Sequence, residues 1–200
     1  PDDADIEPRL VEAYRKLISD TDLDQALVAK MLQLPSEAYL IELTENADVP
    51  AIHRARDSVL RHLAGALKGE LIDCYQRQQN SGPYEVTPEA IARRSLRNTA
   101  LAWLLMIDDE EGRGLAVSQL NAADNMTDRM GALRALVNSG YEADRQKALD
   151  HFYDRFQDDP QVVEQWFSVQ ASSDQAGQLA DIRKLLEHPA FDWKNPNKIR

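Results

Sequence analysis

Apolar residues recur along this chain at intervals of three and four, and strict alternation of apolar and polar residues is nearly absent. That spacing places apolar side chains on one face of an α-helix, whereas a half-buried strand needs a period of two. The pattern therefore predicts an all-α protein. We expect about ten helices, joined by short loops and with no linker between domains.

The ends of the predicted helices are marked by residues that favour helix termini, such as Thr87-Pro88-Glu89 at a start. The longest pattern begins at Pro50 and predicts one helix of about thirty residues, ending near Tyr75. Gly112-Arg113-Gly114 is too short to cradle a phosphate and is expected to form a turn between helices. The other helices are expected at 8–18, 21–32, from 35, 87–107, 112–120, 128–137, 142–156, 161–168 and 174–186.

The predicted helices fall into two stretches of one domain. Residues 1–86 hold the first helices, including the long one, and residues 87–200 hold antiparallel pairs of about 30 to 40 residues each, the length of solenoid repeats. No consensus repeats from pair to pair. We therefore predict an irregular α-solenoid over residues 1–200, in which layered antiparallel helix pairs form an ARM/HEAT-like superhelix.

The charge of the chain excludes several kinds of partner. Its formal net charge of -11 argues against a nucleic-acid or anionic membrane surface, because phosphate groups attract a basic face. No apolar run approaches the length that spans a bilayer. The one cysteine, Cys74, cannot form an internal disulfide, and its apolar neighbours predict a buried thiol in a reducing compartment.

The residues that could carry out hydrolysis are not arranged for it. None of the four histidines, His53, His62, His151 and His188, is followed by Glu as in the zinc motif His-Glu-x-x-His. His53 and His62 are nine residues apart, which turns them to opposite sides of one helix. The doublet Asp150-His151 has no serine in a nucleophile-elbow sequence to act with. We therefore expect neither a metal site nor a catalytic residue in this chain.

The last six residues, from Asn195 to Arg200, begin a helix that the chain does not complete. Asn195 suits the N-cap and Pro196 suits the first helical position. A free-standing solenoid would instead finish with a polar capping helix. We therefore expect the domain to be truncated at its C-terminal end and to belong to something longer.

Three stretches in the second half of the chain together resemble one family. They are Asn121–Asp128 with Ala132-Leu133, Gln165–Ala171, and His188–Phe191 continuing through Asn195–Arg200. In this order and spacing they resemble the C-terminal helical domain of bacterial aminopeptidase N, the M1 (gluzincin) zinc aminopeptidases. Leu34–Glu37 and Arg93–Asn98 fit the same domain, so the resemblance covers essentially the whole chain.

The resemblance implies a function in which this chain does not perform the chemistry. In the family, a separate domain binds zinc and removes N-terminal amino acids from peptides, while the helical domain closes over it and controls peptide entry. This chain would then be an inert cap with no cofactor of its own, in a bacterial cytoplasmic enzyme. Its partners would be the catalytic domain of the same polypeptide and the peptide substrates. The alternative is a free-standing α-solenoid scaffold that binds a partner protein in its concave face.

The resemblance also suggests a residue that meets the substrate. The arginine that closes the Asn-Pro-Asn-x-x-Arg segment, here Arg200, resembles one that faces the interior chamber and reaches the carboxylate end of a peptide. A guanidinium suits that task because its fork donates two parallel hydrogen bonds. The competing interpretation is a surface cation at the end of the chain. Lys198 is a weaker candidate for the same role, and Asn195 is expected mainly to cap.

Overall fold

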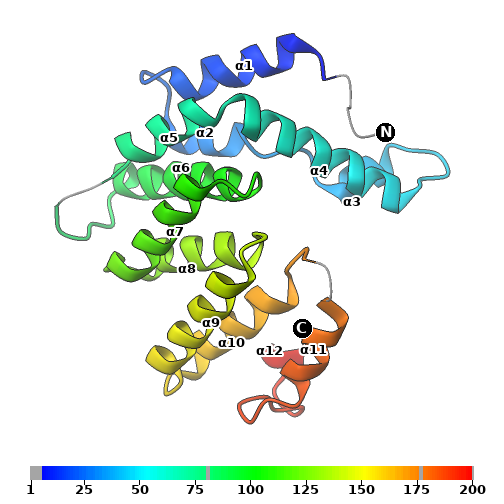
Figure 1. Cartoon of the computed structure of the whole chain (residues 1–200), viewed down its shortest axis with the longest axis vertical. Coiled ribbons are helices and arrows are strands. Elements are labelled where there is room, and N and C mark those ends of the chain that lie inside the picture. Colours follow the sequence, from blue (N-terminus) through cyan, green and yellow to red (C-terminus); the bar gives the residue numbers. More distant parts are fainter. Residues whose placement is uncertain (1–5, 80–81, 176–177, 200) are drawn as a thin grey trace. The chain divides into compact units, whose positions relative to one another are not determined.

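The computed structural model describes residues 6–79, 82–175 and 178–199, and every regular element among them is a helix (Figure 1). The prediction of an all-α, solenoid-like fold is confirmed. This described part holds twelve helices rather than about ten. They are α1 (Pro8–Ser19), α2 (Gln25–Met31), α3 (Glu37–Glu42), α4 (Val49–Ala66), α5 (Lys68–Arg77), α6 (Pro88–Leu105), α7 (Glu110–Ala122), α8 (Met126–Val137), α9 (Glu142–Phe156), α10 (Pro160–Ala171), α11 (Gln178–Leu186) and α12 (Pro196–Ile199).

The single long helix expected from Pro50 to Tyr75 was wrong, because the chain breaks at Leu67 into α4 and α5. Leu67 has φ -116° and ψ 16°, outside helical geometry, yet its side chain is fully buried. The apolar stripe therefore continues across the break and hides it in the sequence. Gly65 and Gly69 flank the break, and both lower the local helix propensity.

Gly112-Arg113-Gly114 does not form the expected turn but lies inside α7. Gly112 is instead a point of close packing on α6, since a Cβ there would lie 3.0 Å from the Cβ of Leu104. Its N–H donates to Oδ2 of Asp109 at 3.0 Å, which satisfies one of the free amides at the start of α7. A glycine required for close approach and a glycine in a turn look alike in one sequence.

The chain divides into two compact units, unit 1 (Pro1–Gly112) and unit 2 (Arg113–Arg200). In unit 1, α6 packs against α2, α4 and α5, and α1 packs against α4 and α5. The expected single domain, with helix pairs from about residue 87, stays a prediction. The core of unit 1 consists mainly of Val28, Ala29, Leu32, Leu63, Leu67, Leu71, Cys74, Tyr75, Leu96, Ala100, Leu101, Trp103, Leu104 and Leu105.

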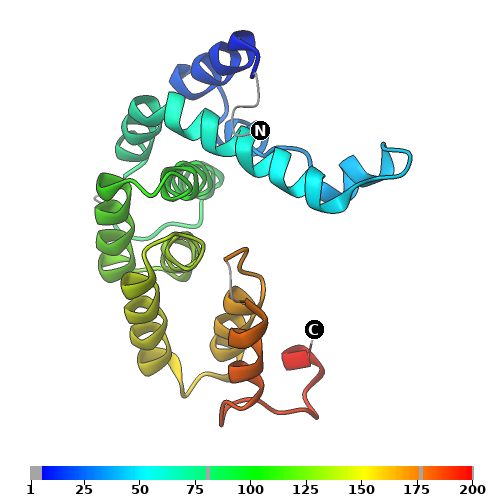
Figure 2. The same cartoon turned by 45° about the vertical axis from the view of Figure 1, so that its right-hand side comes forward.

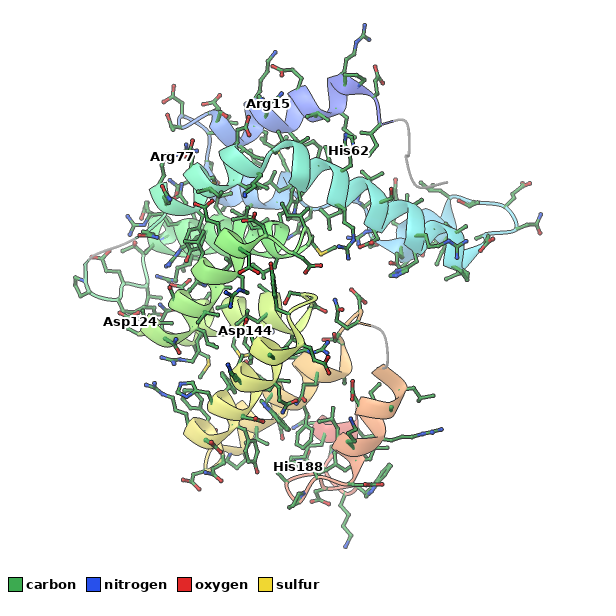
Figure 3. All side chains as sticks on the ribbon, viewed as in Figure 1. Arg15, His62, Arg77, Asp124, Asp144 and His188 are labelled. Carbon is green, nitrogen blue, oxygen red and sulfur yellow. The ribbon has the colours of Figure 1, made fainter. Side chains whose placement is uncertain are left out.

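Two arginines attach α1 to α5 in unit 1 (Figure 3). Arg15 on α1 donates through Nε to Oε1 of Glu70 at 2.7 Å, and this hydrogen bond lowers the pKa of Glu70. Arg77 on α5 donates to the backbone oxygen of Ile18 at 2.9 Å, which satisfies a free carbonyl at the end of α1. Cys74, one turn before Arg77, is fully buried as predicted, and burial raises the pKa of its thiol.

In unit 2, α10 is the central helix and packs against α8, α9, α11 and α12. Trp166 and Phe167 on α10 are both buried, with their rings 5.1 Å apart. The core is completed by side chains from α7 to α10, which are Ala116, Leu120, Met130, Ala132, Leu133, Leu136, Val137, Leu149, Phe152, Val163 and Val169. The short helices α11 and α12 therefore depend on α10 for their position.

Candidate functional site

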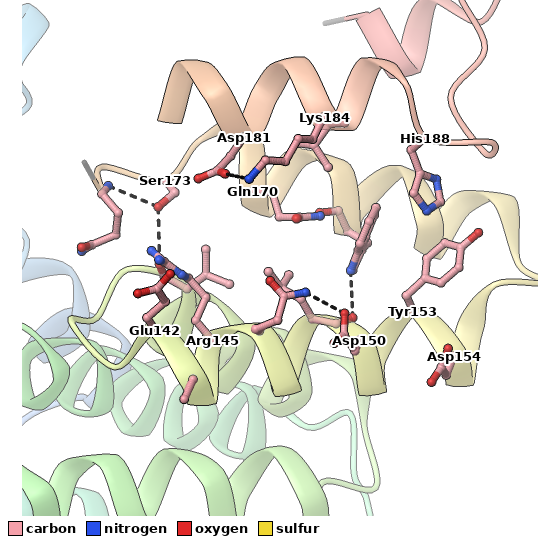
Figure 4. Close-up of a pocket in the computed structure, with 17 residues that line it drawn as sticks. Glu142, Arg145, Asp150, Tyr153, Asp154, Gln170, Ser173, Asp181, Lys184 and His188 are labelled. Atoms are coloured by element: carbon pink, nitrogen blue, oxygen red, sulfur yellow. Dashed lines mark hydrogen bonds and ion pairs between the residues drawn. The ribbon is translucent and has the colours of Figure 1, made fainter. Parts of the chain in front are cut away.

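A groove with a volume of about 960 Å³ lies between α9, α10 and α11 in unit 2 (Figure 4). We call it the unit 2 groove. One wall is a stripe on α9, where Glu142, Gln146, Asp150 and Asp154 recur every four residues and so share a face. The other lining residues are Val137, Ala143, Arg145, Leu149, Tyr153, Trp166, Gln170, Ser173, Gln175, Asp181, Lys184, Leu185 and His188.

One end of the unit 2 groove is aromatic. The ring of His188 lies 4.9 Å from the ring of Tyr153 and 5.2 Å from that of Trp166. Trp166 is held in place because its Nε1 donates to the backbone oxygen of Leu149 at 3.0 Å. Burial lowers the pKa of His188, and its Nδ1 accepts from the N–H of Ala190 at 3.2 Å. The ring is therefore neutral at pH 7, with its proton on Nε2.

The opposite end of the groove is built where the segment after α10 meets the end of α8. Ser173 donates through Oγ to the backbone oxygen of Val137 at 3.4 Å, and Gln175 donates through Nε2 to that of Asn138 at 2.6 Å. The backbone N–H of Asp174 donates to Oδ1 of Asn138 at 3.1 Å. These bonds satisfy carbonyls at the C-terminus of α8 and fix the segment that closes this end.

The charged groups of the groove are partly engaged with one another. Lys184 lies 2.9 Å from Oδ1 of Asp181, and Gln146 donates to Oδ1 of Asp150 at 2.8 Å. Acidic groups nevertheless outnumber basic ones. The carboxylates are those of Glu142, Asp150, Asp154 and Asp181, and the cations are Arg145 and Lys184. Carboxylates, side-chain amides and an aromatic end together can hold a ligand that carries amide groups or a positive charge.

The groove does not bring its serine and its histidine together. Its serine, Ser173, donates to a backbone carbonyl, while His188 lies at the other end among aromatic rings. Covalent catalysis needs such a nucleophile and base within hydrogen-bond reach. Among the residues that the structure describes, no three His, Cys, Asp or Glu side chains gather as metal ligands. The zinc that the family resemblance implies is expected in a separate domain and not in this chain.

The three residues predicted near the C-terminus do not all fall within the described part of the chain. Arg200 lies outside it. Lys198 donates through Nζ to the backbone oxygen of Ala190 at 2.6 Å. Asn195 donates through Nδ2 to Oε1 of Glu164 at 3.0 Å, and its Oδ1 accepts from the N–H two residues on. Asn195 therefore caps α12 and attaches it to α10, and the substrate roles of all three stay predictions.

The stretch Asn121–Asp128, which carries part of the family resemblance, is a polar joint between α7 and α8. Asn125 caps α8, since its Oδ1 accepts from the N–H of Asp128 at 2.9 Å. Arg129 is buried and donates to the backbone oxygens of Leu120 and Ala123 at the end of α7. A buried cation at a helix C-terminus satisfies free carbonyls and the negative end of the helix dipole.

Sequence reasoning did not find the unit 2 groove. The available signal was the stripe of polar residues at four-residue intervals on α9, but such a stripe is also typical of a solvated helix face. The groove exists only because α11 packs on α10 and sets a second wall opposite that stripe. His188 adds the aromatic end, although the sequence shows it only at a helix break.

Among the residues that the structure describes, no helix has both the length and the apolar character needed to cross a membrane. That finding concerns the helices alone. The biological setting of the chain is therefore inferred from the proteins that it resembles.

The chain is similar to bacterial aminopeptidases along nearly its whole length. It is 35% identical to aminopeptidase N of Escherichia coli (strain K12) over 191 residues, which are 96% of this chain and 22% of that protein. It is 32% identical to aminopeptidase N of Caulobacter vibrioides over 194 residues, 97% of this chain and 22% of that protein. The crystal structure of Legionella pneumophila aminopeptidase A in complex with aspartic acid superposes with a TM-score of 0.84 at 28% identity. That match covers 98% of this chain and 24% of the Legionella chain.

These matches confirm the resemblance to aminopeptidase N, and the chain spans 22% of the length of the two curated relatives. Residues 1–200 also match the family described as a domain of unknown function, DUF3458_C, with ARM repeats. That description agrees with the all-α fold. The chain therefore belongs to the DUF3458_C family of ARM-repeat domains and is similar to the helical region of bacterial aminopeptidase N.

Proposed function

We propose that this chain is the helical cap of a zinc-dependent aminopeptidase, which closes over the catalytic domain of the same polypeptide and controls peptide access. The observation that carries the proposal is the match of 96% of this chain to only 22% of aminopeptidase N. A match of that kind supports a chain that forms one domain of a longer enzyme. In the proposal the enzyme works in the bacterial cytoplasm and removes N-terminal amino acids from peptides.

In this proposal the metal and the hydrolysis belong to another part of the polypeptide. The described residues of this chain do not offer three metal-ligand side chains in one place. The chain's own contribution is a binding surface. In the unit 2 groove, Gln146, Gln170 and Gln175 each donate through Nε2 to a group of this chain, and their Oε1 atoms can accept from the N–H groups of a peptide backbone. The aromatic end can take an apolar or cationic side chain of the peptide.

The first experiment compares the full-length protein with the 200-residue chain alone. Both are assayed with aminoacyl p-nitroanilides, before and after chelation and re-addition of zinc. We expect zinc-dependent release of nitroaniline by the full-length protein and none by the isolated chain. Turnover by the isolated chain would contradict its inertness. Absence of turnover by the full-length protein would contradict the aminopeptidase function and favour the free-standing scaffold.

A second experiment tests Arg200 as the group that binds the carboxylate end of a peptide. In the full-length protein, Arg200→Gln should raise KM about tenfold or more for peptides with a free C-terminal carboxylate, because a charge-assisted hydrogen bond is lost. KM for aminoacyl p-nitroanilides, which lack that carboxylate, should stay unchanged. Lys194→Gln is the matched control, since Lys194 is an exposed cation in the same segment. Equal KM changes for both substrate classes would refute the assignment.

A further inference from the structure

Two helices of unit 1 form a projecting element with almost no core of its own. We define the α3–α4 arm as residues 37–60, which comprise α3, the turn after it and most of α4. No residue from 33 to 62 is buried, and the buried side chains of α4, Leu63 and Ala64, lie beyond the arm. In Figures 1 and 2 the joined ends of α3 and α4 extend away from the other helices of unit 1.

The arm is nevertheless held in a defined shape by local hydrogen bonds. Ser36 caps α3 by accepting from the N–H of Tyr39 at 3.2 Å, and Asp48 caps α4 by accepting from that of Ala51 at 2.9 Å. Nδ1 of His53 on α4 lies 2.8 Å from Oε1 of Glu37 on α3. A helix as short as α3 is marginal in water without packing. These hydrogen bonds stabilise the helices of the arm, whose apolar side chains have few packing partners.

The arm carries large apolar side chains in contact with solvent. Tyr39 is 53% exposed, Leu43 67% and Val49 47%, and all three lie on α3 or beside the turn that joins it to α4. Scattered apolar residues are ordinary on a protein surface, but three large ones on an element that has no buried residues make that element a candidate interaction site.

The charge of the arm indicates what covers it. Residues 37–60 hold five carboxylates against two guanidinium groups, those of Arg54 and Arg56, and the whole chain has a formal net charge of -11. Two copies of the chain that paired arm to arm would therefore bring like charges together. The matched relatives are longer, since the chain covers only 22% of each, and under the proposed function the partner is a further domain of the same polypeptide.

We propose that the α3–α4 arm docks this chain onto the catalytic domain of the same polypeptide. Tyr39, Leu43 and Val49 enter an apolar surface on that domain, and Lys or Arg residues around it face the acidic groups of the arm. The inference rests on the proposed function and adds to it the part of the cap that makes the attachment.

Hydrogen exchange tests whether the arm is covered. The amides of residues 37–60 should exchange about tenfold or more slowly in the full-length protein than in the 200-residue chain, because docking suppresses local opening. Equal rates in a full-length protein that hydrolyses aminoacyl substrates would refute the docking arm and leave the proposed function standing. Protection without hydrolysis would support the arm and refute the aminopeptidase. Protection that rises with the concentration of the isolated chain would refute docking onto another domain, because a second copy would then cover the arm.

Substitution separates docking from folding. Leu43→Asp should leave the unfolding temperature of the 200-residue chain unchanged, because this side chain is already largely in water. In the full-length protein it should remove the protection of the arm and lower the unfolding temperature by about 2 °C or more. Val86→Asp adds the same charge at a position that is 70% exposed outside the arm, and should change neither protein. Equal losses from Leu43→Asp in both proteins would show a structural role and refute docking.

Discussion

Replacing Gly112 by alanine should destabilise the chain, whereas the same change two residues later, at Gly114, should stabilise it. Both glycines lie in α7, where alanine improves helix propensity by about 0.5–1 kcal/mol. A Cβ at Gly112 would lie 3.0 Å from the Cβ of Leu104 and 3.4 Å from its backbone carbon and oxygen. A Cβ at Gly114 would have no heavy atom within 4 Å. The two substitutions therefore differ in packing and in little else.

The size of the difference follows from the immobility of Leu104. Leu104 is fully buried in the core of unit 1, and the contact is with its Cβ and backbone, so no rotamer change relieves it. Overpacking of this kind costs about 1–3 kcal/mol. After the gain in helix propensity, Gly112→Ala should lose about 0–2.5 kcal/mol, and its stability should lie about 1–3 kcal/mol below that of Gly114→Ala.

Urea unfolding followed by far-UV circular dichroism measures both variants against the parent chain. The comparison uses midpoints at equal slope, because a change in slope would mean that the unfolded or folded state had changed its compactness. If Gly112→Ala proves as stable as Gly114→Ala, the close approach of α7 to α6 is not a constraint on this position, and the reasoning fails.

The remaining predictions concern three titratable groups. The NMR titration of His188 should have its midpoint below the ordinary pKa of 6.5, because the ring is partly buried. The neutral ring should therefore stabilise the fold fully above pH 6.5, and this stabilisation should be lost as pH falls through the folded pKa. A midpoint at or above 6.5 would contradict the burial of the ring. The parent chain should lose stability as pH falls from 4.5 through the lowered pKa of Glu70, whereas Glu70→Gln should be flatter there in urea melts; identical profiles would show that Arg15 does not stabilise the carboxylate. Cys74 should react with a thiol-reactive disulfide about a hundredfold or more slowly than a free thiol until urea unfolds the chain, because its thiol is buried and its pKa raised.

The sequence predicted helix ends best where a cap and a proline stand together. Thr87 caps α6 and Asp159 caps α10, each followed by proline, and both starts fall where such residues are expected. The predicted range 142–156 coincides with α9 although Tyr141 makes no side-chain cap, because the apolar period is strong there. These features are local, so the residues near each end are enough to indicate them.

The sequence failed where a position is decided by a distant neighbour. The break at Leu67 is invisible because the buried stripe passes through it, and the role of Gly112 depends on Leu104 in another helix. The unit 2 groove was not predicted from the sequence for the same reason. Its stripe on α9 becomes a wall only when Lys184 and His188, from a later part of the chain, lie opposite. Helical periodicity reports which face is apolar but not which polar face another element will enclose.

The proposed capping role requires a domain that keeps its shape while some of its apolar surface is uncovered, and the two units would meet this requirement in different ways. In unit 1 the α3–α4 arm lacks buried side chains, and the caps from Ser36 and Asp48 take over part of the stabilisation that a core supplies elsewhere. Each such cap contributes about 1 kcal/mol, comparable with the burial of about one methylene group. In unit 2 the open surface is concave, and the hydrogen bond from Trp166 to Leu149 fixes its aromatic end from within the core. The arm therefore has well-defined helix caps at the place where it has the least tertiary packing. That arrangement is expected of the proposed docking surface, which must keep its shape before it binds its partner.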